Sequence, residues 1–496
     1  MNEAPTTMTH DREIEEARRT AAWRRRPLII DDDGDMVYDE RTLQGADSFT
    51  QMRHTDLVRA GADSLAWCIH WGICVGTAES VRYWQTQKLG IPFQENMPDP
   101  TPIVEQFCHQ HDIEVFGSIR MNDGHDAFGL PSEHLLYPLK VEHPEFLLGD
   151  ESCRGTPFDG IDAAMWSGLN YAIAEVREDR LWWVRHTATY NLDGIDLNFF
   201  RMPWLFKAGE EDANIDAMTG FIRSARQIVN AASAQRNRPL LLGVRVPDTI
   251  ETCLGIGIDI ESWLKEGLVD RMLSGGGYAS FSAPAKELVD LGHQHDVPVY
   301  PCINCPLTFD LGKGLGFESM RGAAANIWDS GADGIYLWNY HYMKTPHIAC
   351  GQPQPDDYGH LSDLGDPKRL KSLDKVFSVN PVPREQYARA SAPCPLPVEL
   401  DGGCAIPIRI TDDVSTASKV LLQLDIANVI PGDQLHVEFN DQTFAGVEAT
   451  PEIELNIAKS AVKRNINHIS ATSTHRGAGA ETNPALTAVR VPVKYK

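Results

Sequence analysis

Eight short apolar runs, rich in Val, Ile and Leu, recur between residues 27 and 340 and alternate with helical patterns. The runs cover residues 27–31, 64–70, 113–119, 194–200, 239–246, 269–275, 297–303 and 334–340. Strands that alternate with helices indicate βα units and a parallel sheet. Eight such units in about 350 residues predict an α/β fold, a (β/α)₈ TIM barrel, over residues 27–378.

The rest of the chain divides into three parts. Residues 1–26 are polar and predict a helical extension. The stretch "DPKRLKSLDKVFSV" (366–379) has a helical pattern and is interpreted as the last barrel helix, followed by a linker over 379–395. From 396 to 496, period-two alternation between turn signals predicts a small C-terminal antiparallel β-sandwich.

Charge and composition exclude some classes of partner. Asp plus Glu number 69 against 45 for Lys plus Arg, a net charge of −24, which disfavours nucleic acid and membrane surfaces. Neither a secretory signal nor a membrane span is evident, so a cytoplasmic location is expected. The ten cysteines do not form a disulfide framework. Cys302 and Cys305 form an isolated C-x-x-C, without the second ligand pair that a zinc site needs, so we expect no metal or cofactor.

A phrase occurs twice, "HQHDIEVFGSI" from His109 and "HQHDVPVYPCI" from His293. Each copy precedes a strand and so belongs at the N-terminal face of the barrel, whereas barrel active sites lie at the C-terminal face. We therefore expect these histidines to stabilise the fold and not to bind a metal.

Polar residues gather after two of the strands. Strand one ends in "IIDDDGD", with Asp31, Asp32 and Asp33, which is either a solvated turn or a catalytic carboxylate site. Strand three ends in "SIRMNDGHDAF", whose polar residues include Arg120, Asn122, Asp123 and His125. These residues are either part of a functional site or an internally paired Arg–Asp network that only orders the loop.

Other strand ends add charged and aromatic groups. Asp196 lies within strand four, where the alternative to a direct role is bonding inside the barrel. Arg201 comes at the end of strand four, Arg245 has a similar place in strand five, and Trp338 and Asn339 lie at the end of strand eight. Aromatic faces and amides suit a sugar ring, and arginines suit an anionic group on it. Alternatively, the arginines neutralise the nearby aspartates.

The strand "NLDGIDLNFFRMP" (191–203) resembles the D-G-x-D-x-D-x-E signature of family 18 chitinases, with Phe200 in place of the final acid. More of the chain, notably "RMNDGHDAF" and "EVREDRLWWVRHTATYNLDGIDLNFFRMP", resembles the family-10-like glycosyl hydrolases. Within them it is similar to the exo-sialidases of glycoside hydrolase family 156.

That resemblance implies an inverting exo-sialidase that releases terminal sialic acid from sialylated or other acidic glycans, and a possible homodimer. It places His125 and one of Asp33 and Asp32 in the catalytic roles, and makes Arg120, Arg201 and Asn339 sugar-binding residues. Inversion fits the chemistry, because a carboxylate nucleophile would be repelled by the carboxylate of sialic acid.

We add the other mouth residues to the expected binding set: Asn122, Asp123, Asp196, Arg245 and Trp338. Two alternatives stay open: a glycosidase of the same fold that acts on another glycan, and a non-catalytic carbohydrate-binding barrel.

Overall fold

The computed structural model describes most of the chain. The described residues are 4–32, 47, 50–51, 54–69, 100–124, 137–150, 152, 166–276, 280–304, 316–338, 357–381, 390–479 and 481–495. No helix among them is long and apolar enough to cross a membrane.

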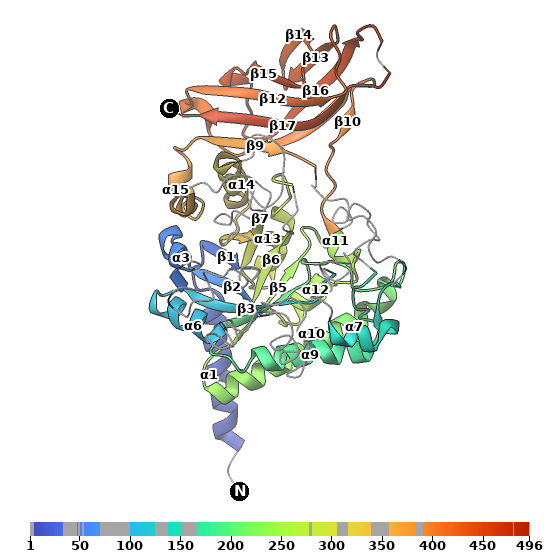
Figure 1. Ribbon diagram of the computed structural model, residues 1–496. Coiled ribbons are helices and arrows are strands. Elements are labelled where there is room, and N and C mark those ends of the chain that lie inside the picture. The colour runs from blue at the N-terminus through green and yellow to red at the C-terminus, as the bar shows by residue number, and fades with distance from the viewer. Residues whose placement is uncertain are drawn as a thin grey trace.

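Eight parallel strands close into a barrel in chain order, which confirms the predicted fold (Figure 1). The strands are β1 (Leu28–Asp32), β2 (Ser64–Cys68), β3 (Glu114–Arg120), β4 (Gly194–Asn198), β5 (Leu241–Val246), β6 (Arg271–Ser274), β7 (Val299–Asn304) and β8 (Ile335–Trp338). Each overlaps one of the predicted runs. Outward residues such as Ile195 and Leu197 are fully buried against the surrounding helices, as a barrel of this class requires.

Helices surround the barrel, and α1 extends from it at the end opposite the C-terminal domain (Figure 1). The α-helices are α1 (Ala4–Ala22), α3 (Thr55–Ala60), α6 (Thr101–Gln110), α7 (Pro138–Glu142), α9 (Ala174–Thr187), α10 (Ile215–Arg236), α11 (Ile250–Leu254), α12 (Ile260–Lys265), α13 (Lys286–Gln294), α14 (Phe317–Asp329) and α15 (Pro367–Leu370). Short 3₁₀ turns are η5 (Pro144–Phe146), η7 (Asp212–Asn214), η9 (Asp357–Asp363), η11 (Val414–Thr416) and η12 (Lys459–Ala461).

The C-terminal part is a sandwich of two antiparallel sheets, as predicted. One sheet has the order β10 (Val398–Glu399), β17 (Ala485–Lys494), β12 (Lys419–Ala427), β15 (Glu452–Asn456), with β9 (Lys375–Val379) also on β17. The other has the order β11 (Cys404–Ile410), β16 (Asn465–His475), β13 (Gln434–Phe439), β14 (Gln442–Glu448). Their inner faces bury a separate core, which includes Leu422, Val437, Ile469 and Val491.

The interpretation of residues 366–379 as one helix is wrong. Only α15 is helical, and "KVFSV" forms the buried strand β9, which pairs with β17. Aromatic and β-branched side chains favour this pleated, buried position. The sandwich sheet therefore begins before the predicted start of that domain at residue 396.

The sandwich rests on α14 of the barrel. Arg409 on β11 bonds Asp329 at 2.8 Å, and Lys494 on β17 bonds Glu318 at 2.6 Å. The side chain of Asn326 bonds the Arg409 carbonyl at 3.1 Å and accepts from Thr411 at 3.0 Å. One helix thus carries polar contacts to two strands of the second domain.

A repeated interaction closes the N-terminal face of the barrel. The aspartate just before each even-numbered strand accepts the backbone N–H of the residue opposite it on the preceding odd strand. The four pairs are Asp63 with Leu28 (3.0 Å), Asp193 with Val115 (2.9 Å), Asp270 with Leu242 (2.7 Å) and Asp333 with Val299 (2.8 Å). Each aspartate also donates its own N–H to the carbonyl of the same residue. We call each such pair a carboxylate staple.

The duplicated H-Q-H-D phrase belongs to two of these staples. His109 bonds the carboxylate of Asp193 at 2.9 Å, and His293 bonds that of Asp333 at 2.9 Å. Both histidines therefore contribute to stability at the N-terminal face, as expected from their position in the sequence.

A buried ion pair crosses the middle of the barrel. Arg271 on β6 bonds both carboxylate oxygens of Asp196 on β4, with Nε 2.9 Å from Oδ1, and its guanidinium lies over the ring of Phe116. Gly243 on β5 leaves room for this pair, because a Cβ there would lie 2.0 Å from Asp196 Oδ1 and 2.8 Å from Arg271 Cγ. The alternative of an internal structural role for Asp196 is thus the observed one.

The staple of Asp193 should make the stability of the barrel depend on pH. The hydrogen bond to Asp193 raises the pKa of His109. The stabilisation that protonated His109 contributes is therefore fully present below about pH 6.5 and is lost as pH rises through the raised pKa. Burial would raise the pKa of Asp193, but the bonds from His109 and Val115 outweigh it and lower that pKa. The contribution of Asp193 is therefore lost only in acid, as pH falls through the lowered value.

We expect Asp193→Asn to reduce the free energy of unfolding by about 1 kcal/mol at pH 5.5 and by less at pH 9. Chemical unfolding followed by circular dichroism at both pH values measures this. Asp63→Asn is the matched control, because burial, only partly offset by the Leu28 N–H, raises the pKa of Asp63 and disfavours its charge. An equal loss for Asp193→Asn at the two pH values would contradict the assignment.

A second prediction concerns the space at Gly243. We expect Gly243→Ala to lower stability by about 3 kcal/mol, because its methyl group displaces a buried ion pair. Gly220→Ala on α10 is the control, since a Cβ there meets no atom within 4 Å. Thermal unfolding of both variants tests this, and a neutral Gly243→Ala would refute it.

Candidate active site

The upper interior of the barrel holds a buried cluster that faces the C-terminal mouth. Asp31 on β1 accepts a hydrogen bond of 2.7 Å from the Tyr336 hydroxyl on β8. The Arg245 guanidinium lies 5.0 Å from the ring centre of Tyr336 and 5.6 Å from that of Trp338. Arg201, just after β4, lies 5.3 Å from the ring centre of Trp338. Four strand ends thus meet in one place.

Arg245 is held at the wall of the barrel. Its Nε donates to the carbonyl of Gly275 at 3.3 Å, and its Nη2 contacts the Cys302 sulfur at 3.7 Å. Arg245 is fully buried, and its guanidinium lies close to two aromatic rings of β8. A cation in this setting is attracted to the ring faces, and little solvent screens its charge.

The protonation of the cluster follows from its burial. Burial and the charge of Asp31 raise the pKa of Tyr336 well above its usual range, so this hydroxyl stays protonated and donates. Burial also raises the pKa of the Cys302 thiol, to about 11, so it is a protonated thiol near neutral pH and a poor nucleophile.

Hydrogen bonds hold the described residues that follow β3, 121–124. Arg120 bonds Asp123 at 2.9 Å, and Lys140 donates to the Asp123 carbonyl at 2.5 Å. Asn122 donates to the carbonyls of Leu169 and Trp204 and accepts the Leu169 N–H. The Arg120–Asp123 bond is the Arg–Asp pairing that the alternative for this segment expects, and the other contacts commit the Asn122 amide to the backbone.

Asp31 and Asp32 face opposite sides of β1. Asp32 is buried with its carboxylate 3.5 Å from His54, and His54 packs against Trp67 and Phe107. Trp67 itself bonds Thr101 of α6, so this group lies between the sheet and its helices. Asp32 therefore points toward the helices, whereas Asp31 points into the barrel.

Three of the expected site residues, Asp33, His125 and Asn339, lie outside the described residues. Of the described ones, Arg201, Arg245 and Trp338 come together, Arg120 and Asp123 pair with each other, and Asp196 lies deeper in the barrel. Phe200 is buried, as expected for a wall residue.

The sequence named Asp31 only as one of a run of aspartates, and it did not single out Tyr336 or Asp248. Tyr336 could have been found, because it alternates with Trp338 on the same face of β8. Asp248, just after β5, is buried and accepts the Ala392 N–H at 2.8 Å. Burial raises its pKa to about 7 in spite of that bond.

A metal centre does not emerge from the described part of the chain, which contains no group of three or more His, Cys, Asp or Glu side chains that could hold an ion. The described cluster instead combines cations, a carboxylate, a phenol and an indole.

No protein-family model and no curated protein matches the sequence. The resemblance to family 156 therefore stays a prediction.

Solved structures show a distant similarity. They include the chitinase ChiW from Paenibacillus sp. str. FPU-7, with 12% identity, a TM-score of 0.38 and coverage of 92% of this chain and 40% of that one. The α-galactosidase TtGalA from Thermus thermophilus has 14% identity and a TM-score of 0.36, with coverage of 71% and 65%. The chitinase ChiA74 from Bacillus thuringiensis has 9% identity and a TM-score of 0.40, with coverage of 95% and 85%.

This chain thus spans 40% of the length of ChiW and 65% of that of the α-galactosidase. At these identities and TM-scores, the similarities carry no argument about the reaction or the substrate.

Proposed function

We propose that this protein is a glycoside hydrolase that removes a terminal acidic sugar of the sialic acid type, with inversion at the anomeric carbon. One observation carries the proposal: three buried arginines stand at the ends of neighbouring strands, and two of them contact Trp338. Arg120, Arg201 and Arg245 are 2%, 4% and 0% exposed.

The proposal is supported by the placement of these arginines. In a chain of net charge −24, Arg120, Arg201 and Arg245 lie at the carboxyl ends of β3, β4 and β5, the face on which barrel enzymes act. Arg120 is paired with Asp123, and Arg201 and Arg245 both lie over the ring of Trp338. Guanidinium groups bind a carboxylate through paired hydrogen bonds. Trp338 offers an apolar surface beside them, which suits the face of a sugar ring.

The acid and base of the reaction would be a carboxylate and an imidazole. An inverting enzyme needs one group to activate water and another to protonate the leaving oxygen. We propose His125 for one role, as the family resemblance implies. For the other, the resemblance favours Asp33, and the geometry adds Asp31, which Tyr336 holds in the barrel interior. The orientation of Asp32 toward His54 argues against a direct role for it.

We expect the protein to release free sialic acid from a sialylated oligosaccharide and from a fluorogenic sialoside. Chromatography of the released sugar, with neutral fluorogenic glycosides in parallel, provides the measurement. Release of a neutral sugar alone would show that the substrates are neutral glycosides and not sialosides. Release of no sugar from any of these substrates would refute the proposal that the protein is a glycoside hydrolase.

Isosteric Asp→Asn variants can show which of the three aspartates takes part in catalysis. We expect His125→Ala and one of Asp31→Asn and Asp33→Asn to lower kcat by about 10²- to 10⁴-fold, because each removes an acid or a base. Asp32→Asn is the matched control and should keep kcat within about threefold, since this residue faces the helices. Full activity in both Asp31→Asn and Asp33→Asn, with thermal stability unchanged, would overturn the assignment.

A further inference from the structure

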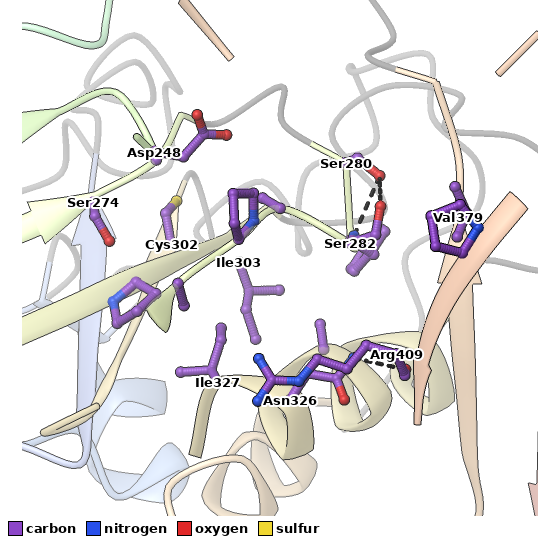
Figure 2. Close-up of a pocket in the computed structure, with 18 of the residues that line it drawn as sticks. Asp248, Ser274, Ser280, Ser282, Cys302, Ile303, Asn326, Ile327, Val379 and Arg409 are labelled. Carbon is purple, nitrogen blue, oxygen red and sulfur yellow. Dashed lines mark hydrogen bonds between the residues drawn. The ribbon is translucent and has the colours of Figure 1, made fainter. Parts of the chain in front are cut away.

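A cavity of about 330 Å³ lies between the barrel and the sandwich (Figure 2). On the barrel side its walls include the segment 280–285, the ends of β6 and β7, and Ile327 of α14. Val379 of β9, Arg409 of β11 and Ile466 of β16 line it from the sandwich. Both domains are therefore needed to form this cavity, and ligand sites are frequent at such domain interfaces.

The cavity shares a wall with the candidate active site. Gly275 and Cys302 both line it, and both contact Arg245, through the Gly275 carbonyl and the Cys302 sulfur. In Figure 2, Asp248 and Cys302 lie on one side of the view and Ser280 and Ser282 on the other, with Ile303 between them. The cavity is thus a neighbour of the mouth and not part of it.

Its lining is largely apolar, with the hydroxyl group of Ser274 on one side and those of Ser280 and Ser282 on the other (Figure 2). Five prolines contribute apolar ring faces, namely Pro284, Pro301, Pro393, Pro395 and Pro407. Ser280 and Ser282 face each other across a hydrogen bond of 2.7 Å on the segment that forms one wall. A compound with an apolar face and a rim of hydroxyl groups matches this combination.

Among the described lining residues, two are charged, Arg409 and Asp248. Arg409 pairs through Nη2 with Asp329 at 2.8 Å, and its buried Nε has no hydrogen-bond partner among the described residues, so that N–H can donate to a ligand hydroxyl. Asp248 is buried, accepts the Ala392 N–H at 2.8 Å and, because burial raises its pKa, can donate to a hydroxyl when protonated. With one paired cation and one carboxyl group, these walls suit a neutral hydroxylated ligand better than an anion.

We infer that this cavity is a second binding site, for a single neutral monosaccharide or a polyol of similar size. Its volume lies at the small end of the range for ligand pockets, about 300–1,000 Å³, and so admits one ring and not an oligosaccharide. The site does not depend on the proposed hydrolase activity, because its residues are separate from the acid and base of the mouth.

Titration calorimetry with galactose, glucose and N-acetylglucosamine, and with N-acetylneuraminic acid for comparison, tests the site in the full-length protein. Ala283→Trp fills the cavity from the barrel side, and Ile466→Trp fills it from the sandwich side, where Ile466 is 46% exposed and tolerates a larger ring. Ala231→Trp, on the exposed part of α10, is the control.

We expect at least one neutral sugar to bind the wild-type protein and the control with the same Kd, and both filling variants to bind it at least tenfold more weakly. Circular dichroism shows that each variant is folded. Absence of neutral sugar binding, or unchanged binding in both filling variants, would overturn the inference. Neither result concerns turnover of sialosides, so failure of this site and failure of the proposed hydrolase are distinguishable.

Discussion

The ion pair of Asp196 and Arg271 fixes the interior of the barrel. A buried ion pair is compatible with a stable fold only if its geometry is nearly ideal. Removing the two charged groups from water costs free energy, and their mutual attraction must offset that cost. Here the pair is bidentate, Phe116 lies beneath the guanidinium, and Gly243 leaves the space that the pair fills. The registers of β4, β5 and β6 are consequently tied to one another by a polar contact and not only by packing.

This pair also separates two zones with different roles. Toward the N-terminal face, Arg26 bonds Glu114 in a second buried pair, next to the carboxylate staples. Toward the mouth, Asp31, Tyr336 and Arg245 form the cluster that we propose to serve the reaction. The described interior therefore holds paired charges at its middle and N-terminal end, and arginines, a carboxylate and aromatic rings toward the mouth.

The sequence predicted the strands well, because each is a continuous apolar run between turn signals. It also predicted the inward face of β4, where Asp196 and Asn198 alternate with Ile195 and Leu197. The stretch "IIDDDGD" lacks this alternation of polar and apolar residues, because its aspartates are consecutive. The sequence therefore does not reveal which aspartate faces into the barrel. The role of Asn122 could not be predicted either, because its partners at Leu169 and Trp204 are distant in the chain. Residues 375–379 were assigned to a helix because their partner strand, β17, lies more than a hundred residues later.

The carboxylate staples have a consequence for how the barrel can be divided. Every staple joins an odd strand to the even strand that follows it, so each two-stranded unit contains one complete staple. A break in the chain after an even strand, such as between β4 and β5, leaves each of the four staples within a single fragment. A break after an odd strand separates the two partners of one staple. The barrel is therefore built from four quarter units, and fragments that end after an even strand are the ones that retain the means to reassemble.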